Sequence, residues 1–289
     1  MQPLIDTELW LAHKRRALAR PVEGADFLMH RAAEDLADRL GAVERKFEKA
    51  AALFCQTPAA AEVLAESGKV AEIARVEADR SFLAGASGIV APLETVSFEA
   101  ESLDLVVSLL SLQAMNDIPG MLAQIRRVLK PDGLFLGAFA GAGTLAELRE
   151  SLLAAETELY GGASPRVLPF TDVRDAGALL QRAGLALPVA DVETVTVRYD
   201  TLFDLCADLR AMGETSPLID RNRRPGSRRL FARAAEIYAQ RFSDADGRVR
   251  ASFSIVWISG WAPDASQQKP LKPGSAKVSL KSVLEKRGP

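Results

Sequence analysis

The fold of this chain is decided by residues 98–139, which read FEAESLDLVVSLLSLQAMNDIPGMLAQIRRVLKPDGLFLGAF. Two apolar runs, residues 103–112 and 134–139, are too continuous for strands that expose one face to water. Unbroken runs of valine and leucine suit parallel strands that helices cover on both faces. We therefore expect two buried parallel strands here.

The segment between these strands has the pattern of an amphipathic helix. Asp117 is placed to cap its first turn, where Pro119 is tolerated. Apolar residues then recur at helical spacing and form one face toward the sheet: Ile118, Met121, Leu122, Ile125 and Leu129. Pro131 ends the helix, and Gly133 permits a positive φ in the turn that follows. The result is a strand–helix–strand unit, whose crossover should be right-handed.

The same alternation continues on both sides of this unit. The other expected strands are residues 47–55, 70–76, 88–90, 192–199 and 251–261. The expected helices are residues 4–20, 26–40, 58–66, 144–160, 172–183 and parts of 201–242, with breaks at 213–217 and 225–226. Strands that alternate with helices predict an α/β fold with a doubly wound, mostly parallel sheet.

Length and composition exclude several classes of protein. The 289 residues suffice for one large α/β domain with a helical addition, or for two small domains. A net charge of −2 gives no overall field for nucleic acid or an anionic membrane. No apolar run approaches the roughly 20 residues that cross a bilayer, and the first residues lack an apolar signal core. We therefore expect a cytoplasmic protein with neither a nucleic-acid nor a membrane partner.

Cysteines and histidines are too few for the common metal and disulfide sites. Cys55 and Cys206 lie far apart, and His13 and His30 are the only histidines. This pattern offers no disulfide framework and no familiar zinc spacing. Without a neighbouring base, Cys55 is expected to be a buried small hydrophobe. The default prediction for both histidines is a solvated position.

A small ligand of a doubly wound sheet binds at the carboxyl ends of its strands. A nucleotide-like ligand needs a glycine-rich turn after the first strand and a carboxylate after the second. Asp79 supplies that carboxylate, unless it caps the following residues instead. The turn, residues 52–58, reads ALFCQTP and has no glycine. Phe54 and Gln56 add bulk there, so a ligand that needs close backbone approach should bind poorly.

Two core motifs, DLVVS at residues 104–108 and LKPDG at 129–133, resemble the fourth-strand region of class I methyltransferases that use S-adenosylmethionine (SAM). Further motifs resemble one family, the bacterial and mitochondrial proteins similar to assembly factor 5 of respiratory complex I. They lie at residues 26–28, 36–40, 144–149, 155–158, 164–166, 212–214 and 260–261. The resemblance spans nearly the whole chain, from about residue 4 to about residue 283.

This resemblance implies a Rossmann-like, seven-stranded sheet with an antiparallel last strand, N-terminal helices and a helical insertion before that strand. The implied division is an N-terminal helical segment (1–45), a methyltransferase-like domain (46–262, insertion about 200–245) and a flexible tail (263–289). SAM is the implied ligand, and a complex I subunit is the implied client or substrate. The implied cofactor pocket consists of Ala52, Phe54, Cys55, Gln56, Asp79, Leu93, Ser108 and Leu109.

The chain departs from the family where SAM would bind. The family's Asp-Leu-Gly-Cys-Gly loop is replaced by ALFCQ at residues 52–56. Where the family has an acidic residue after the third strand, this chain has APLE at residues 91–94. The family's Gly-Gly-Asp is replaced by GAG at residues 141–143. Gln113 stands where a His-Trp pair would begin, and an amide is a poor general base. Asp79 alone survives. One charged hydrogen bond of about 1.5–3 kcal/mol falls short of the roughly 8 kcal/mol of micromolar binding.

Our hypothesis is therefore a methyltransferase-like protein with a degenerate cofactor loop, in which SAM binding is weak or absent and which acts as a protein-binding assembly factor for complex I. The alternatives are an active SAM-dependent methyltransferase, or related protein-modifying enzyme, with a remodelled site, and a pocket reshaped for another small ligand. No catalytic residue is assigned. The candidate partner surface is the basic cluster Arg221, Arg223, Arg224 and Arg228, for which a merely solvated face is the ordinary alternative.

Overall fold

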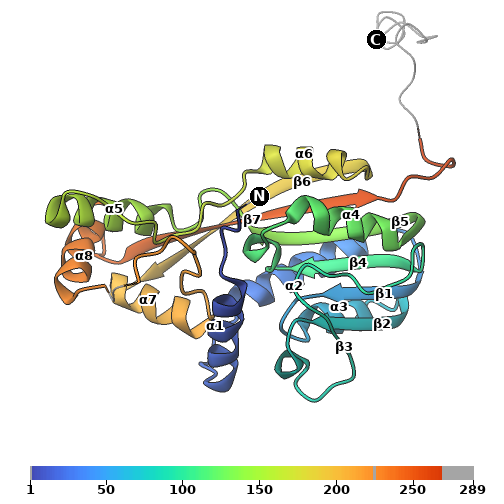
Figure 1. Ribbon diagram of the computed structural model, residues 1–289, viewed down its shortest axis with the longest axis horizontal. Helices are drawn as coiled ribbons and strands as arrows, with labels where there is room; N and C mark the ends of the chain where they lie inside the picture. The colour runs from blue at the N-terminus through green and yellow to red at the C-terminus, as the bar shows by residue number, and fades with distance from the viewer. Residues whose placement is uncertain (1, 224–225, 269–289) are drawn as a thin grey trace, which may run out of the picture.

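The computed structural model describes residues 2–223 and 226–268. Within them a seven-stranded sheet has the order β3-β2-β1-β4-β5-β7-β6 (Figure 1). Its strands are β1 Phe47–Leu53, β2 Val70–Glu77, β3 Ile89–Val90, β4 Leu103–Leu109, β5 Leu129–Ala140, β6 Ala186–Tyr199 and β7 Val249–Trp261. Strands β1 to β5 pair in parallel, whereas β7 is antiparallel to both β5 and β6. The predicted class I methyltransferase fold is confirmed.

Both faces of the central strands are buried, as their apolar runs predict. Ala51, Val106 and Phe135 lie in register across β1, β4 and β5 and belong to the core on one face. That core is covered by α4 (Ile118–Val128) and α6 (Val173–Arg182). Leu105 and Val107 point to the other core, which α2 (Phe27–Gly41) and α3 (Ala59–Glu66) cover.

The helical insertion builds a third core at one end of the molecule. Helices α7 (Leu202–Ala211) and α8 (Arg228–Phe242) lie between β6 and β7 in the chain and gather with α5 (Ala146–Tyr160) (Figure 1). Leu205, Tyr238 and Phe253 are buried together among them. Helix α1 (Thr7–Ala19) lies between this end and the strands β1 to β3 (Figure 1).

The turn between α4 and β5 differs in detail from the prediction. Leu103 pairs with Leu129 but Leu105 pairs with Leu134, so residues 130–133 bulge out of the sheet. The residue with positive φ is Asp132, at 60°, and not Gly133 as expected. Gly133 is needed for close approach instead, because a Cβ there would lie 2.9 Å from the Lys130 carbonyl oxygen.

Two strand boundaries also shift. Strand β1 ends at Leu53 rather than at residue 55, because Phe54 and Gln56 turn into the left-handed region. Strand β6 begins at Ala186 rather than at residue 192, since an edge strand tolerates Pro188 and the irregular pairing between Ala186 and Val189. No helix among the described residues is long and apolar enough to span a bilayer. The predicted C-terminal tail lies outside the described residues from residue 269 onward.

Candidate functional site

The turn after β1 keeps a backbone shape that suits glycine but carries large side chains. Phe54 has φ of 55° and Gln56 has φ of 62°, both in the left-handed region. Both positions are glycine in the methyltransferase-like family that this chain resembles. A residue with a Cβ is disfavoured by roughly 1–2 kcal/mol in that conformation. The turn therefore has a backbone that suits glycine, although both positions carry large side chains.

The side chains of this turn point into the protein. Phe54 is 1% exposed and belongs to the same core as Val76 and Ala91. Cys55 is also buried, and its sulfur accepts the Leu109 N–H at 3.4 Å. Burial raises the pKa of the Cys55 thiol to about 12, so it stays protonated at neutral pH. The prediction that Cys55 is a buried small hydrophobe is confirmed.

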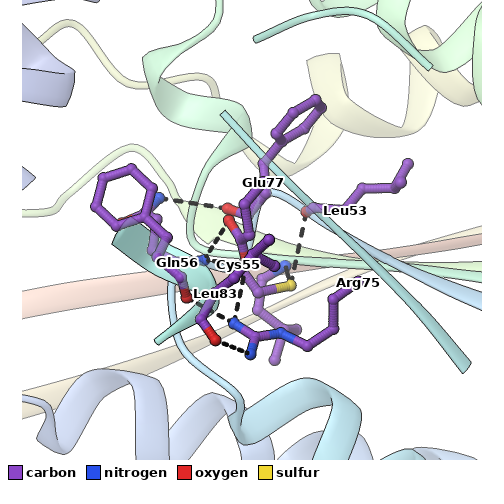
Figure 2. A network of polar contacts seen from close by, with 9 residues as sticks. Leu53, Cys55, Gln56, Arg75, Glu77 and Leu83 are labelled. Atoms are coloured by element: carbon purple, nitrogen blue, oxygen red, sulfur yellow. Dashed lines mark hydrogen bonds and ion pairs between the residues drawn. The ribbon is translucent and has the colours of Figure 1, made fainter. Parts of the chain in front are cut away.

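A buried carboxylate holds this turn from the neighbouring strand (Figure 2). The Gln56 backbone N–H donates to both carboxylate oxygens of Glu77, each at 3.0 Å. Glu77 is 1% exposed, and Nη2 of the buried Arg75 lies 3.4 Å from it and donates to the Phe82 carbonyl oxygen at 2.8 Å. Burial raises the pKa of Glu77 to about 7, although the Gln56 N–H and Arg75 favour its ionised form. The Gln56 N–H is therefore already hydrogen-bonded to the side chain of Glu77.

Asp79, the expected ribose ligand, already has partners on both carboxylate oxygens. Its Oδ1 accepts the Ser81 N–H at 2.9 Å and the Ser81 hydroxyl at 2.7 Å, which caps the 3₁₀ helix η1 (Arg80–Leu83). Its Oδ2 accepts from the Arg15 guanidinium at 2.8 Å. The Ser81 hydrogen bonds, with a smaller contribution from Arg15, lower the pKa of Asp79. The capping role that the sequence left open is present, and Arg15 of α1 is the residue that covers this carboxylate.

Helix α1 and the residues just before it contact both the carboxyl edge of the sheet and the insertion. The Leu4 and Ile5 N–H groups both donate to Asn116 Oδ1 at 2.8 Å, beyond the end of β4. His13 Nδ1 lies 3.0 Å from the Thr215 carbonyl oxygen, in the segment after α7. The prediction of a solvated His13 is wrong: the ring is 8% exposed, and this burial lowers its pKa. The helical pattern did not reveal that the insertion covers this face.

Two cavities lie beside α1 and the residue that caps it, Asp6. The larger, about 640 Å³, lies beyond β4 and β5, between α5, α7 and the segment before α8. The smaller, about 260 Å³, is lined by Gln56 and Thr57 of the turn and by residues of α1 and α2. Leu28, Leu110 and Met212 line both, so the two cavities adjoin.

The structure does not gather the expected cofactor residues around one cavity. Gln56 lines the smaller one, and none of the eight lines the larger. The others lie in the cores or beside them: Ala52, Phe54, Cys55, Ser108 and Leu109 are buried, Leu93 is half-buried, and Asp79 is engaged by Ser81 and Arg15. The hydroxyl of Ser108 is hydrogen-bonded to the hydroxyl of Ser111, with the two oxygens 3.1 Å apart.

The expected partner surface is split. Arg221 and Arg223 line the larger cavity, whereas Arg228 is exposed in the first turn of α8. Arg224 lies outside the described residues. Sequence reasoning missed Arg210, which comes from the end of α7 and lines the same cavity. Its place two residues before the Met-Gly-Glu motif at 212–214 was the available signal.

Comparison with known proteins identifies the family. A methyltransferase domain family matches residues 54–137. The human protein named arginine-hydroxylase NDUFAF5, mitochondrial, is 37% identical over 285 residues, which cover 96% of this chain and 82% of that protein. The chain belongs to the NDUFAF5 family. A Dictyostelium discoideum protein of the same name is 43% identical over 186 residues, 64% of this chain, and the match spans 42% of its own length.

Solved structures agree on the fold. The BH2331 protein of Bacillus halodurans C-125 matches with a TM-score of 0.56 at 16% identity, over 80% of this chain and all of that chain. At this identity the likeness shows the fold alone. Around the site, the described residues contain no cluster of three or more histidine, cysteine or acidic side chains placed to hold a metal ion.

The cytoplasmic location expected from composition is wrong. NDUFAF5 proteins that match most of this chain are named as mitochondrial. The prediction failed because a net charge of −2 and two free cysteines suit any reducing compartment equally. Composition therefore could not separate one such compartment from another.

Proposed function

We propose that this NDUFAF5-family chain is a methyltransferase-fold protein whose SAM loop is degenerate and which works by binding a client protein. One observation carries this function: the turn has a glycine-type backbone, but its residues are Phe54, whose ring is buried in the core, and Gln56. The Gln56 N–H of the same turn is taken by Glu77. A sulfonium nucleoside would have to displace Glu77 before it could accept this N–H.

The small volume of the cavity beside the turn also supports weak SAM binding. The cavity that Gln56 lines measures about 260 Å³, below the roughly 300–1,000 Å³ typical of ligand pockets. Asp79 would have to release Ser81 and Arg15 before it could accept a ribose diol. Together these features leave little binding energy for SAM.

A client-binding role is supported by the larger cavity and by the family. About 640 Å³ is bounded by α5 and by the insertion, beyond the ends of β4 and β5. The family resemblance implies a subunit of respiratory complex I as the client. We propose that the insertion and this cavity together contact that client, so that the chain acts as an assembly factor.

The test is SAM binding by the purified full chain. We expect no saturable rise in melting temperature with micromolar SAM or its demethylated product, and neither molecule in the denatured protein by mass spectrometry. A SAM-binding methyltransferase measured in parallel is the positive control. Saturable stabilisation that the Asp79→Ala variant loses would refute the degenerate loop and favour an active methyltransferase with a remodelled site.

A second candidate comes from the relatives' name. Proteins named arginine-hydroxylase match this chain at 37% identity over 96% of its length, which supports modification of an arginine side chain on the client. Mass spectrometry of complex I subunits from cells with and without this protein separates the two functions. One extra oxygen atom on an arginine, present only with the protein, would establish the enzyme. Unmodified subunits that co-purify with the protein would favour pure binding.

A further inference from the structure

The larger cavity has an apolar floor. Leu145, Leu148 and Leu152, around the first turns of α5, line it together with Phe231 and Phe253. Apart from Phe231, which is half-buried, these side chains are buried in the third core. An apolar floor with a few polar groups at its edge is the usual construction of a site that takes an apolar side chain.

The charges on the cavity are not balanced. Arg210 and Arg223 are exposed on its edge, and neither guanidinium has a hydrogen-bond or ion-pair partner within residues 2–223 and 226–268. The acidic groups on the cavity are already engaged, since Asp6 lies 3.4 Å from Arg221 and Glu214 pairs with Lys14. Unpaired guanidinium groups favour a carboxylate and disfavour another cation.

Gln113 and Ser216 both line this cavity, and each carries a buried polar atom that has no partner among the described residues. The Gln113 side-chain amide donates to the Leu110 carbonyl oxygen at 2.7 Å, which fixes its orientation. Its Oε1 is then a buried acceptor without a hydrogen bond in the described part of the chain, and Ser216 Oγ is in the same state. An acceptor of this kind needs a hydrogen-bond donor. A peptide backbone supplies an N–H, whereas an ionised fatty acid or a phosphate dianion has no donor.

We propose that the larger cavity binds an extended peptide segment in which an apolar side chain neighbours an aspartate or glutamate. The apolar side chain fills the leucine and phenylalanine floor, a backbone N–H donates to Gln113 Oε1, and the carboxylate meets Arg210 and Arg223. This inference rests on the proposed function in one respect: the segment belongs to the client protein.

Three synthetic pentapeptides test the ligand class. Each is acetylated and amidated, with leucines flanking a central glutamate, glutamine or arginine, and binding to the full chain is followed by fluorescence anisotropy. We expect the glutamate peptide to bind at least about tenfold tighter than the arginine peptide, with the glutamine peptide between them. The preference should shrink as salt is raised. Equal affinities, no binding, or a preference for arginine would overturn the inference.

Charge-reversed variants locate the binding site. Arg210→Glu and Arg223→Glu should each weaken the glutamate peptide about tenfold or more, because an attractive charge becomes a repulsive one. Arg174→Glu, on the exposed face of α6 and away from both cavities, makes the same charge change and should leave affinity unchanged. Gln113→Met should weaken all three peptides and keep their order. An equal loss in Arg174→Glu would show a general charge effect and refute the site.

The failures of the two proposals can be told apart. If SAM binds at micromolar concentration while the peptides rank as expected, the degenerate loop is wrong and the peptide site stands. If the peptides fail to discriminate while complex I subunits still co-purify with the protein, the peptide site is wrong and client binding stands. Melting temperatures of every variant show that each one is folded.

Discussion

Glu77 holds the backbone N–H of Gln56 with both of its carboxylate oxygens, each 3.0 Å away (Figure 2). The two residues come from neighbouring strands, one at the end of β2 and the other just after β1. The contact joins a buried acid to a turn whose backbone suits glycine but whose residues are Phe54 and Gln56. It helps to hold the turn in this strained shape.

The first prediction concerns pH. The pKa of Glu77 is raised from about 4.5 to about 7, so the folded protein holds this proton more tightly than the unfolded chain does. Stability from Glu77 is therefore full below pH 4.5 and falls as pH rises through 7. Relative to Glu77→Gln, the wild type should lose up to about 3 kcal/mol of unfolding free energy across this range. Denaturant titrations at several pH values measure the difference.

The control for that prediction is Glu72→Gln, which changes an exposed glutamate on the same strand. Its stability should follow the wild type at every pH. If the Glu77→Gln and wild-type curves ran parallel between pH 4.5 and 8, Glu77 would have no raised pKa and the burial argument would be wrong.

The second prediction concerns the strained turn. Gln56→Gly should raise the free energy of unfolding by about 0.5–1 kcal/mol. Glycine adopts φ of 62° without strain, and this gain exceeds the extra chain entropy that glycine loses on folding. The lost side chain donates only one hydrogen bond, to the Phe54 carbonyl oxygen at 3.3 Å. Thr57→Gly, one residue later and without positive φ, should instead destabilise. Destabilisation by both variants would mean that the turn is not strained at Gln56.

The third prediction concerns Asp79. Asp79→Ala removes the cap of η1 and should cost about 1 kcal/mol at neutral pH. Because the pKa of Asp79 is lowered, this contribution should disappear as pH falls through the folded-state pKa. Arg15→Ala removes only the ion pair and should cost less. Client co-purification should persist in both variants, and its loss in Asp79→Ala alone would argue for a ligand at that carboxylate.

The fourth prediction concerns the wall of the larger cavity. Buried Glu156 accepts the Ser164 N–H at 2.8 Å and the Arg166 Nε–H at 2.9 Å. Glu156→Ala should destabilise by about 3–5 kcal/mol, because Arg166 then keeps a largely buried charge without a partner. Glu158→Ala, two residues along α5, breaks an exposed pair with Arg233 and should change stability little.

Adding Arg166→Ala to Glu156→Ala provides the internal check on this pair. The double variant should recover part of the loss, since the unpaired charge is gone. Chemical denaturation of the four proteins completes the cycle. Strictly additive losses would show that the two side chains act independently.

Much of the fold could be predicted from the sequence because burial leaves a local pattern. The runs at residues 103–112 and 134–139 predicted strands covered on both faces, and Leu105 and Val106 indeed enter opposite cores. Family motifs outside the core supplied the antiparallel last strand and the insertion. What failed was local detail, as at Asp132, where neighbouring side chains and not residue type alone choose the left-handed position.

The sequence by itself determined the sheet, its order of elements and the loss of glycine after β1, since these depend on periodicity and on residue identity at fixed positions. Only the tertiary structure decided that Glu77 binds Gln56, 21 residues away, and that Arg15 covers Asp79, 64 residues away. It also decided that Arg210, Gln113 and Ser216 line one cavity. Such pairings depend on which strands are neighbours and where helices cross the sheet edge, which no local pattern encodes.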